Sequence, residues 1–171
     1  MFNIKVKYGD TDINISFPCT NNELYAKFAE LHVPDEKKSQ VQVFVADIDY
    51  PELEGLKDNF YDTDELNHLA QRLNSLDANE LKKFDAVAAL NKTNSIRELI
   101  NLTYNMHYYT LIRDMSNLAE IGRIHILTRE GGISVNEAKE MDFEKIGRKL
   151  IESGTGKLTK YGLLFTNDDL S

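Results

Sequence analysis

Residues 2–17 read FNIKVKYGDTDINISF, and their pattern determines the fold expected for the N-terminal part of the chain. Apolar and polar side chains alternate over residues 2–8 and again over residues 11–17, and Gly9 and Asp10 lie between the two runs. Alternation of this kind is typical of strands with one buried face, and a glycine in a two-residue connection favours a tight turn. The stretch therefore predicts an antiparallel hairpin.

A helix and a third strand are expected to follow the hairpin. Thr20 stands three residues before Glu23, which is the spacing of a capping box at a helix start. Apolar residues then recur at helical spacing until Pro34 ends the run, and valines alternate with other residues around Val43. Residues 1–60 are therefore expected to form a small ββαβ module.

The central part of the chain, residues 61–115, has the pattern of a helical domain. Three pairs of residues have capping-type spacing directly before apolar residues at helical spacing, namely Asp62 with Glu65, Asp77 with Glu80, and Ser95 with Glu98. Because the linkers between these helices are short, we expect the helices to be neighbours and roughly antiparallel.

The last part, residues 116–171, predicts a mixed C-terminal α+β module. Ser116 and Ser134 each stand at the start of an apolar helical pattern, and the second pattern runs through Leu150. Two glycines end this helix, and residues 157–165 suggest a closing hairpin. The whole chain is accordingly assigned to the α+β class, with small sheets at its ends and helices between them.

Acidic side chains are concentrated in one central segment. Eight of the nineteen residues from 47 to 65 are carboxylates, and only Lys57 opposes them. Residues 41–81 carry a formal charge of −8, which is that of the whole chain, whereas residues 1–40 sum to −1 and residues 82–171 to +1. Since like charges at this density oppose folding by self-repulsion, the segment favours a partner-facing surface. The candidate partner-binding residues are Asp47, Asp49, Glu52, Glu54, Asp58, Asp62, Asp64, Glu65, Asp77 and Glu80.

The partner that this pattern suggests is a basic groove built to hold nucleic acid. Side chains two apart on a strand lie about 6.6–6.8 Å apart on one face, and side chains three or four apart on a helix lie about 5–6 Å apart. Asp47 with Asp49, and Asp62 with Glu65, have these spacings, which suit a replacement of successive backbone phosphates. Acid-rich loops are also ordinary solvated surface, and acids at a helix start complement the helix dipole.

Composition argues against several classes of protein. No apolar run approaches the roughly 18–20 residues that span a bilayer, and the N-terminus has the pattern of a strand instead of a signal peptide. Cys19 is the only cysteine, and no Cys/His cluster has the spacing of a zinc site. We therefore expect a cytoplasmic protein with no metal, no cofactor and no membrane partner.

Other candidate chemistry is sparse. Asp64 and His68 stand four residues apart on an expected helix, as metal ligands or an acid/base pair can, but the sequence marks no third ligand. A basic cluster within residues 148–160 is weak evidence for nucleic-acid binding in a chain that is acidic as a whole. We expect neither an enzyme nor direct binding of nucleic acid.

Short stretches at residues 64–70, 95–102, 117–123, 146–150 and 162–165 read DELNHLA, SIRELINL, NLAEIGR, IGRKL and GLLF. In this order they resemble the ArdA antirestriction family, with collinear matches over about residues 41–166. The resemblance implies a non-enzymatic inhibitor carried by a mobile element and acting inside a bacterial host cell. It also implies an elongated molecule of three small domains that pairs as a homodimer.

ArdA proteins imitate the shape and charge of bent B-form DNA and occupy the DNA-binding groove of type I restriction-modification enzymes. By this resemblance we expect competitive, stoichiometric inhibition, with the acidic segment in the role of the DNA backbone. Three alternatives stay open. One is inhibition of a CRISPR (Cas) nuclease, whose basic duplex channel is a similar target. Another is a scaffold or regulator that binds a protein through Leu99–Met115, and the last is a hydrolase that uses Asp64 and His68.

Overall fold

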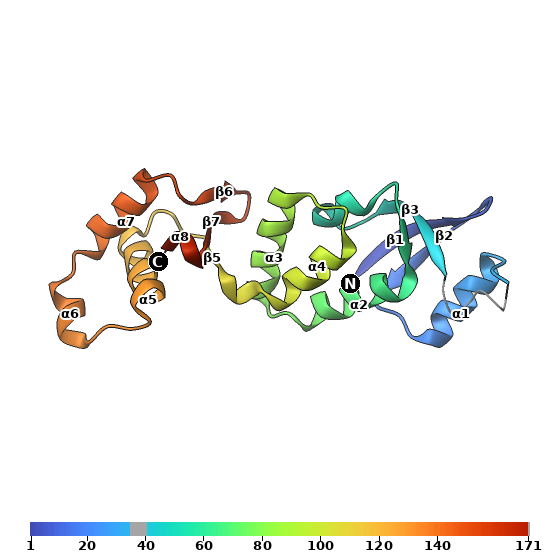
Figure 1. Cartoon of the computed structure of the whole chain (residues 1–171), viewed down its shortest axis with the longest axis horizontal. Coiled ribbons are helices and arrows are strands. Elements are labelled where there is room, and N and C mark those ends of the chain that lie inside the picture. Colours follow the sequence, from blue (N-terminus) through green and yellow to red (C-terminus); the bar gives the residue numbers. More distant parts are fainter. Residues whose placement is uncertain (35–40, 171) are drawn as a thin grey trace. The chain divides into compact units, whose positions relative to one another are not determined.

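The computed structural model describes residues 1–34 and 41–170. These residues form two antiparallel sheets, of four and three strands, together with α-helices and short 3-10 helices (Figure 1). The assignment to the α+β class is confirmed. Within the described residues, no helix combines the length and the apolar character that crossing a bilayer requires.

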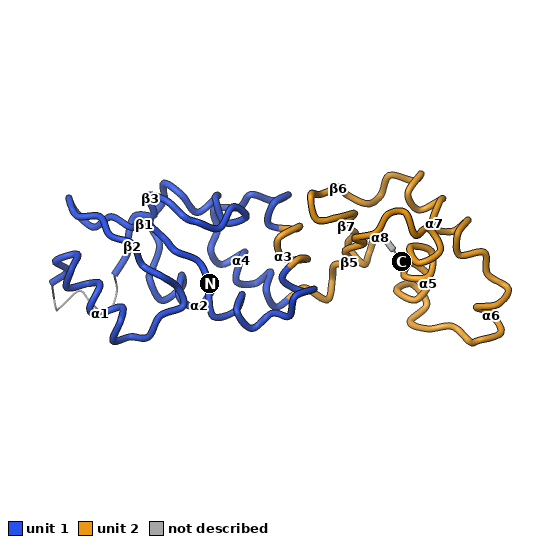
Figure 2. The backbone as a smooth tube through the Cα atoms, turned by 180° about the vertical axis from the view of Figure 1, so that it is seen from behind, with its two compact units in different colours: residues 1–81, 88–104 blue, residues 82–87, 105–171 orange. Residues whose placement is uncertain are grey.

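The chain divides into two compact units (Figure 2). Unit 1 holds residues 1–81 and 88–104, and unit 2 holds residues 82–87 and 105–171. Helix α3 (Ala78–Asn91) contributes residues to both units. The division into three modules, with boundaries after residues 60 and 115, stays a prediction.

Unit 1 is built on a four-stranded sheet with the strand order β2-β1-β3-β4. Its strands are β1 (Phe2–Tyr8), β2 (Thr11–Phe17), β3 (Gln42–Ile48) and β4 (Phe60–Asp62), each antiparallel to its neighbours. The predicted hairpin and third strand are confirmed, and Gly9 has the positive φ of 60° that favours glycine in the β1–β2 turn. The 3-10 helix η2 (Pro51–Leu56) and the edge strand β4 were not predicted.

One face of this sheet belongs to the core of unit 1, and the other face is open. The inward side chains of Ile4, Val6 and Val45 are fully buried, and helices α1 (Asn21–Glu30) and α2 (Thr63–Ser75) pack against strands of the sheet. Each such burial contributes about 1.5–3 kcal/mol. Alternate residues of β1 and β2 are exposed on the opposite face, which is therefore available to a partner.

The expected helix starts in unit 1 are confirmed. The capping side chains are Thr20 for α1, Asp62 for α2, Asp77 for α3 and Ser95 for α4 (Ile96–Tyr104). At α2 the bond comes from the backbone N–H of Asp64, at 2.8 Å. Glu65, which stands at the capping-box position of this helix, turns toward Arg97 instead. The carboxylate of Glu65 is thereby committed to a contact between two helices.

Unit 2 contains a three-stranded sheet with the order β5-β7-β6, together with short helices. Its elements are η3 (Met106–Tyr108), β5 (Tyr109–Ile112), α5 (Leu118–Glu130), α6 (Val135–Glu140), α7 (Phe143–Glu152), β6 (Lys157–Thr159), β7 (Gly162–Thr166) and α8 (Asn167–Leu170). The β6–β7 hairpin confirms the expected closing hairpin. Strand β5 was not predicted, and it brings Ile112 opposite Leu163 in the core.

Two helix predictions in this unit are wrong in detail. The pattern expected to run from Ser134 through Leu150 is two helices, because the chain turns extended at Met141 and Asp142 caps a new helix by accepting from the N–H of Lys145 at 3.0 Å. The cap of α5 is Asn117 and not Ser116, whose hydroxyl donates to Asp114. In both places the side chain of an Asn or Asp accepts from a free backbone N–H in the first turn of the helix.

Helices α5 and α7 meet through two glycines. A Cβ atom added at Gly147 would lie 2.0 Å from the carbonyl oxygen of Leu118 and 2.9 Å from the backbone nitrogen of Gly122. A Cβ atom added at Gly122 would lie 2.0 Å from the carbonyl oxygen of Phe143 and 2.9 Å from the nitrogen of Gly147. The two backbones therefore touch, at a distance that only glycine permits at either position.

Candidate acidic binding surface

The net charge of the chain belongs entirely to unit 1. Unit 1 holds 17 acidic and 9 basic residues, whereas unit 2 holds 11 of each. The sequence already placed this charge between residues 41 and 81, and the fold shows which of these acids come together. The resulting field favours a basic partner for unit 1.

Several of the acids follow one another along strand β3. Asp62 is the register partner of Gln42 at the start of this strand, and the N–H of Asp58 donates to the carbonyl of Val45 at 2.8 Å. Asp47 lies within the strand, and Asp49 follows its last residue. Seven residues of extended chain span about 23 Å. Asp47 and Asp49 therefore stand at one end of a longer row, and β3 ends at Ile48, one residue before Asp49.

Two acids of this row are held by specific partners. The carboxylate of Asp47 accepts from the Lys57 ammonium at 3.2 Å, and the hydrogen bond and charge of Lys57 lower its pKa. Asp49 accepts from the backbone N–H and from the side-chain amide of Asn3, both at 2.6 Å, and these bonds lower its pKa. Both carboxylates therefore remain ionised to a lower pH than an unperturbed aspartate.

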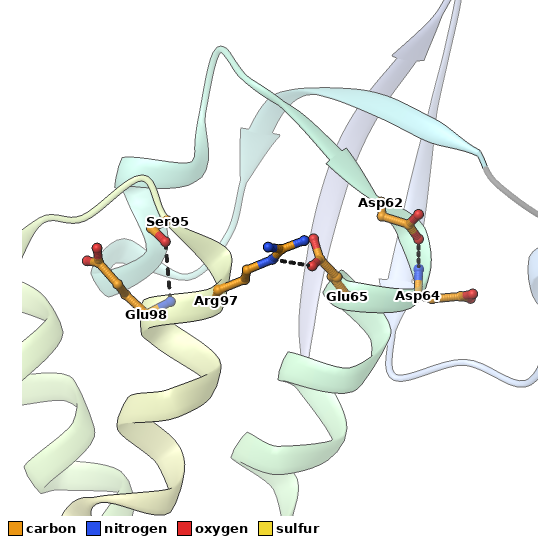
Figure 3. Close-up of polar contacts among 6 residues, drawn as sticks. All are labelled: Asp62, Asp64, Glu65, Ser95, Arg97 and Glu98. Carbon is orange, nitrogen blue, oxygen red and sulfur yellow. Dashed lines mark hydrogen bonds and ion pairs between the residues drawn. The ribbon is translucent and has the colours of Figure 1, made fainter.

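The first turns of α2 and α4 lie side by side and carry further acids next to the row along β3 (Figure 3). The Arg97 guanidinium on α4 donates to Glu65 on α2 at 3.1 Å. The loop before α4 is fixed to the rest of unit 1, since the Tyr61 hydroxyl donates to the carbonyl of Asn94 at 2.6 Å. Glu98 follows in the first turn of α4, and its side chain points away from α2 (Figure 3).

Helix η2 is bound to the same loop. A Cβ atom added at Gly55 would lie 2.4 Å from the carbonyl oxygen of Thr93, so the two backbones are in close contact. The hydroxyl of Thr93 donates to the Glu98 carboxylate at 2.7 Å. We call the resulting surface the acidic edge, and define it as Asp47, Asp49, Glu52, Glu54, Asp58, Asp62, Asp64, Glu65 and Glu98. Sequence reasoning missed Glu98 as a member, although its place in a helix start was visible.

Asp77 and Glu80 are not part of the acidic edge. They form the capping box of α3, at the opposite end of α2 from Asp62. The 13 residues of α2 make that distance about 20 Å. Of the ten acids proposed from the sequence, eight therefore lie in the acidic edge and two start a helix elsewhere.

Asp77 offers a test of this division of roles. Asp77→Ala should lower the free energy of unfolding by about 1 kcal/mol, because two backbone N–H groups lose their acceptor. Asp77→Ser keeps an acceptor at the cap and removes the charge, so it should stay close to the original stability. Urea unfolding of both variants measures the difference, and an equal loss in both would show that the charge of Asp77 matters more than its cap.

Asp64 and His68 are the residues of the hydrolase alternative. The Nε2 atom of His68 lies 3.3 Å from the Tyr104 hydroxyl, and the Tyr104 ring lies under the Arg72 guanidinium at 3.9 Å. The structure thus gives His68 an aromatic neighbour. In the described ranges no group of three or more His, Cys, Asp or Glu residues is arranged to hold a metal ion.

The segment Leu99–Met115, the basis of the scaffold alternative, has two kinds of side chain. Leu99, Met106 and Ile112 are buried, whereas Tyr104 and Tyr108 are about half exposed. Its aliphatic residues therefore serve the cores of the units. Among the described residues of this segment, the exposed large apolar side chains are Tyr104, Tyr108 and Met115.

The basic cluster expected within residues 148–160 is partly neutralised. Arg148 donates to Glu144 at 2.9 Å on the exposed face of α7. This pairing reduces the positive charge that the cluster can offer to a phosphate backbone.

Comparison with known proteins matches the chain to no family model and to no curated protein. The geometry and charge of its own residues are therefore what supports a function.

Proposed function

We propose that this protein is an ArdA-like antirestriction inhibitor, a DNA mimic that occupies the DNA-binding groove of a type I restriction-modification enzyme. The observation that carries the proposal is the acidic edge. Carboxylates from a strand, a 3-10 helix and the first turns of two helices lie on one connected frame in unit 1. A rigid frame of separated negative charges is what a replacement for the DNA backbone requires.

The density of charge supports the proposal. One strand of duplex DNA carries about one charge per 3.4 Å of axis, or about seven charges over 23 Å. The acidic edge has nine carboxylates, and pairing with Lys57 and Arg97 leaves a net of −7. Four of these carboxylates, Asp47, Asp49, Asp58 and Asp62, lie along β3, and the other five lie on η2, α2 and α4. The number of charges is therefore that of a short stretch of one DNA strand, distributed over several elements.

The proposed inhibitor acts without catalysis, metal or cofactor, in the cytoplasm of a bacterial host cell. It binds as a homodimer, which doubles the number of carboxylates and allows the track to span more of the groove. Its only macromolecular target is a protein, because a surface of net −7 repels nucleic acid.

The test is a titration of the purified protein into a type I restriction-modification enzyme, with DNA cleavage and complex formation as the two readings. We expect cleavage to stop at equimolar inhibitor in about 0.1 M salt, and the complex between inhibitor and enzyme to dissociate toward 1 M salt, because the Debye length falls from about 10 Å to about 3 Å. Full cleavage with no complex would reject this target. If the protein instead inhibits a Cas nuclease in the same assay, it is still a DNA mimic, but its target is the Cas nuclease.

A further inference from the structure

Two aromatic side chains, Phe44 and Phe60, lie among the carboxylates of the acidic edge. Phe60 on β4 is 66% exposed, and its ring centroid lies 5.3 Å from that of Phe44, its register partner on β3, at an interplanar angle of 64°. Phe44 and Phe60 alternate with the buried Val43 and Tyr61, so both rings belong to the open face of the sheet. Phe60 contributes little to the core of unit 1, and its exposure needs another explanation.

The surroundings of Phe60 decide what can bind there. Asp62 stands two residues after Phe60 on β4, and on a strand residues two apart share a face at about 6.7 Å. Asp58 lies in the turn that precedes β4, two residues before Phe60, and is exposed. Of the described cations, Lys57 is paired with Asp47, and Lys7 lies opposite Phe44 on β1. An apolar partner at this site would remove water from Asp58 and Asp62 and would offer no hydrogen-bond donor in place of that water.

We propose that Phe60 and Phe44 form a platform for an arginine side chain of the partner protein. The guanidinium stacks on the Phe60 ring and donates to Asp58 or Asp62. Arginine suits this site better than lysine, because its planar group is weakly hydrated, stacks on rings and donates in a fork. The inference rests on the proposed function for the identity of the partner, and it adds which side chain of a basic groove the site recognises.

A tryptophan at position 60 makes the site observable by itself. The chain contains no tryptophan, so Phe60→Trp introduces its only tryptophan at the platform, and the fluorescence of this tryptophan is excited at longer wavelength than that of the eight tyrosines. Titration with a short oligoarginine peptide, at about 0.01 M salt, should quench or shift this fluorescence with an affinity about five- to tenfold tighter than that of an oligolysine peptide of equal length.

The matched control is Leu158→Trp. Leu158 is 67% exposed on β6 and lies between Lys157 and Lys160. Its tryptophan should not respond to oligoarginine, because the neighbouring charges repel the peptide. Equal affinity of the Phe60→Trp variant for the two peptides, or equal responses of the two tryptophan variants, would overturn the platform.

The inhibition assay separates this inference from the proposed function. Phe60→Leu keeps an apolar side chain but removes the ring, and it should weaken inhibition of the type I enzyme about tenfold. Undiminished inhibition by Phe60→Leu would reject the platform and leave the acidic edge intact as the mimic. If the original protein does not inhibit at all, the proposed function fails, and the peptide titration still tests the platform.

Discussion

Replacing Gly147 by alanine is expected to disrupt the packing of α5 against α7 and to lower the free energy of unfolding by about 3 kcal/mol. The added methyl would lie 2.0 Å from the carbonyl oxygen of Leu118, which is backbone and cannot rotate away as a side chain can. The helices must separate to admit it, and the core around Ile121 and Leu150 loses contacts. Urea unfolding followed by circular dichroism gives the change in stability.

Hydrogen exchange locates the damage. Amides of α5 and α7 should lose protection in Gly147→Ala, whereas Lys149→Ala, an exposed neighbour on α7, should change stability by less than about 0.5 kcal/mol. Gly122→Ala should resemble Gly147→Ala, because its methyl meets the carbonyl of Phe143 in the same way. The double variant should cost less than the sum, since one separation relieves both clashes. A Gly147→Ala protein as stable as the original would contradict the observed crossing.

Neutralising three acids of the acidic edge is expected to weaken binding to the type I enzyme by about 10- to 100-fold. The variant is Glu54→Gln, Asp58→Asn and Asp64→Asn. All three carboxylates are exposed, and the charges of Glu54 and Asp58 act only as secondary causes on Lys57, which is paired with Asp47, so their loss should leave stability nearly unchanged. Each contributes about 0.5–1 kcal/mol when it faces a cation of the partner. Asparagine also accepts the positive φ of 62° at position 58.

A matched variant in unit 2 controls for the change in total charge. Glu140→Gln, Glu144→Gln and Glu152→Gln remove three exposed carboxylates, and inhibition should change less than threefold, within about 0.6 kcal/mol. Equal losses in both variants would mean that only the net charge matters. If neither variant loses inhibition, the acidic edge is not part of the interface with the enzyme. Reversal of Asp49 or Asp62 is less informative, because their carboxylates also bond to Asn3 and cap α2.

Local signals explain which parts of the fold the sequence could predict. The hairpin over residues 2–17 and the caps at Thr20 and Asp77 depend on neighbours within a few positions, and they are as expected. Strand β5 has four residues and depends on β7, more than fifty positions later, so its own pattern was too short to show it. The interruption of the helix at Met141 was not predicted, because the apolar residues on both sides of it have the spacing of one continuous helix.

The acidic edge shows the same limit. The concentration of acids in residues 47–65 was evident from composition alone. That Arg97 would reach Glu65 depends on how α2 and α4 lie together, and that Glu98 would join the surface depends on the contact between η2 and the loop before α4. The exposure of Phe60 also depends on β4 being an edge strand, which no pattern of three residues could indicate.

The glycine crossing has a consequence for how this protein can change over time. Asn117 and Asp142 each cap a helix, and four residues later both helices continue with Ile-Gly-Arg. Backbone meets backbone where they cross, so the fit depends on the two glycines and on few exposed side chains, among them Arg123, whose guanidinium lies over the Phe143 ring. Substitution of the other exposed residues can therefore change the surface charge of unit 2 from neutral to acidic or basic while the contact between the two helices is preserved.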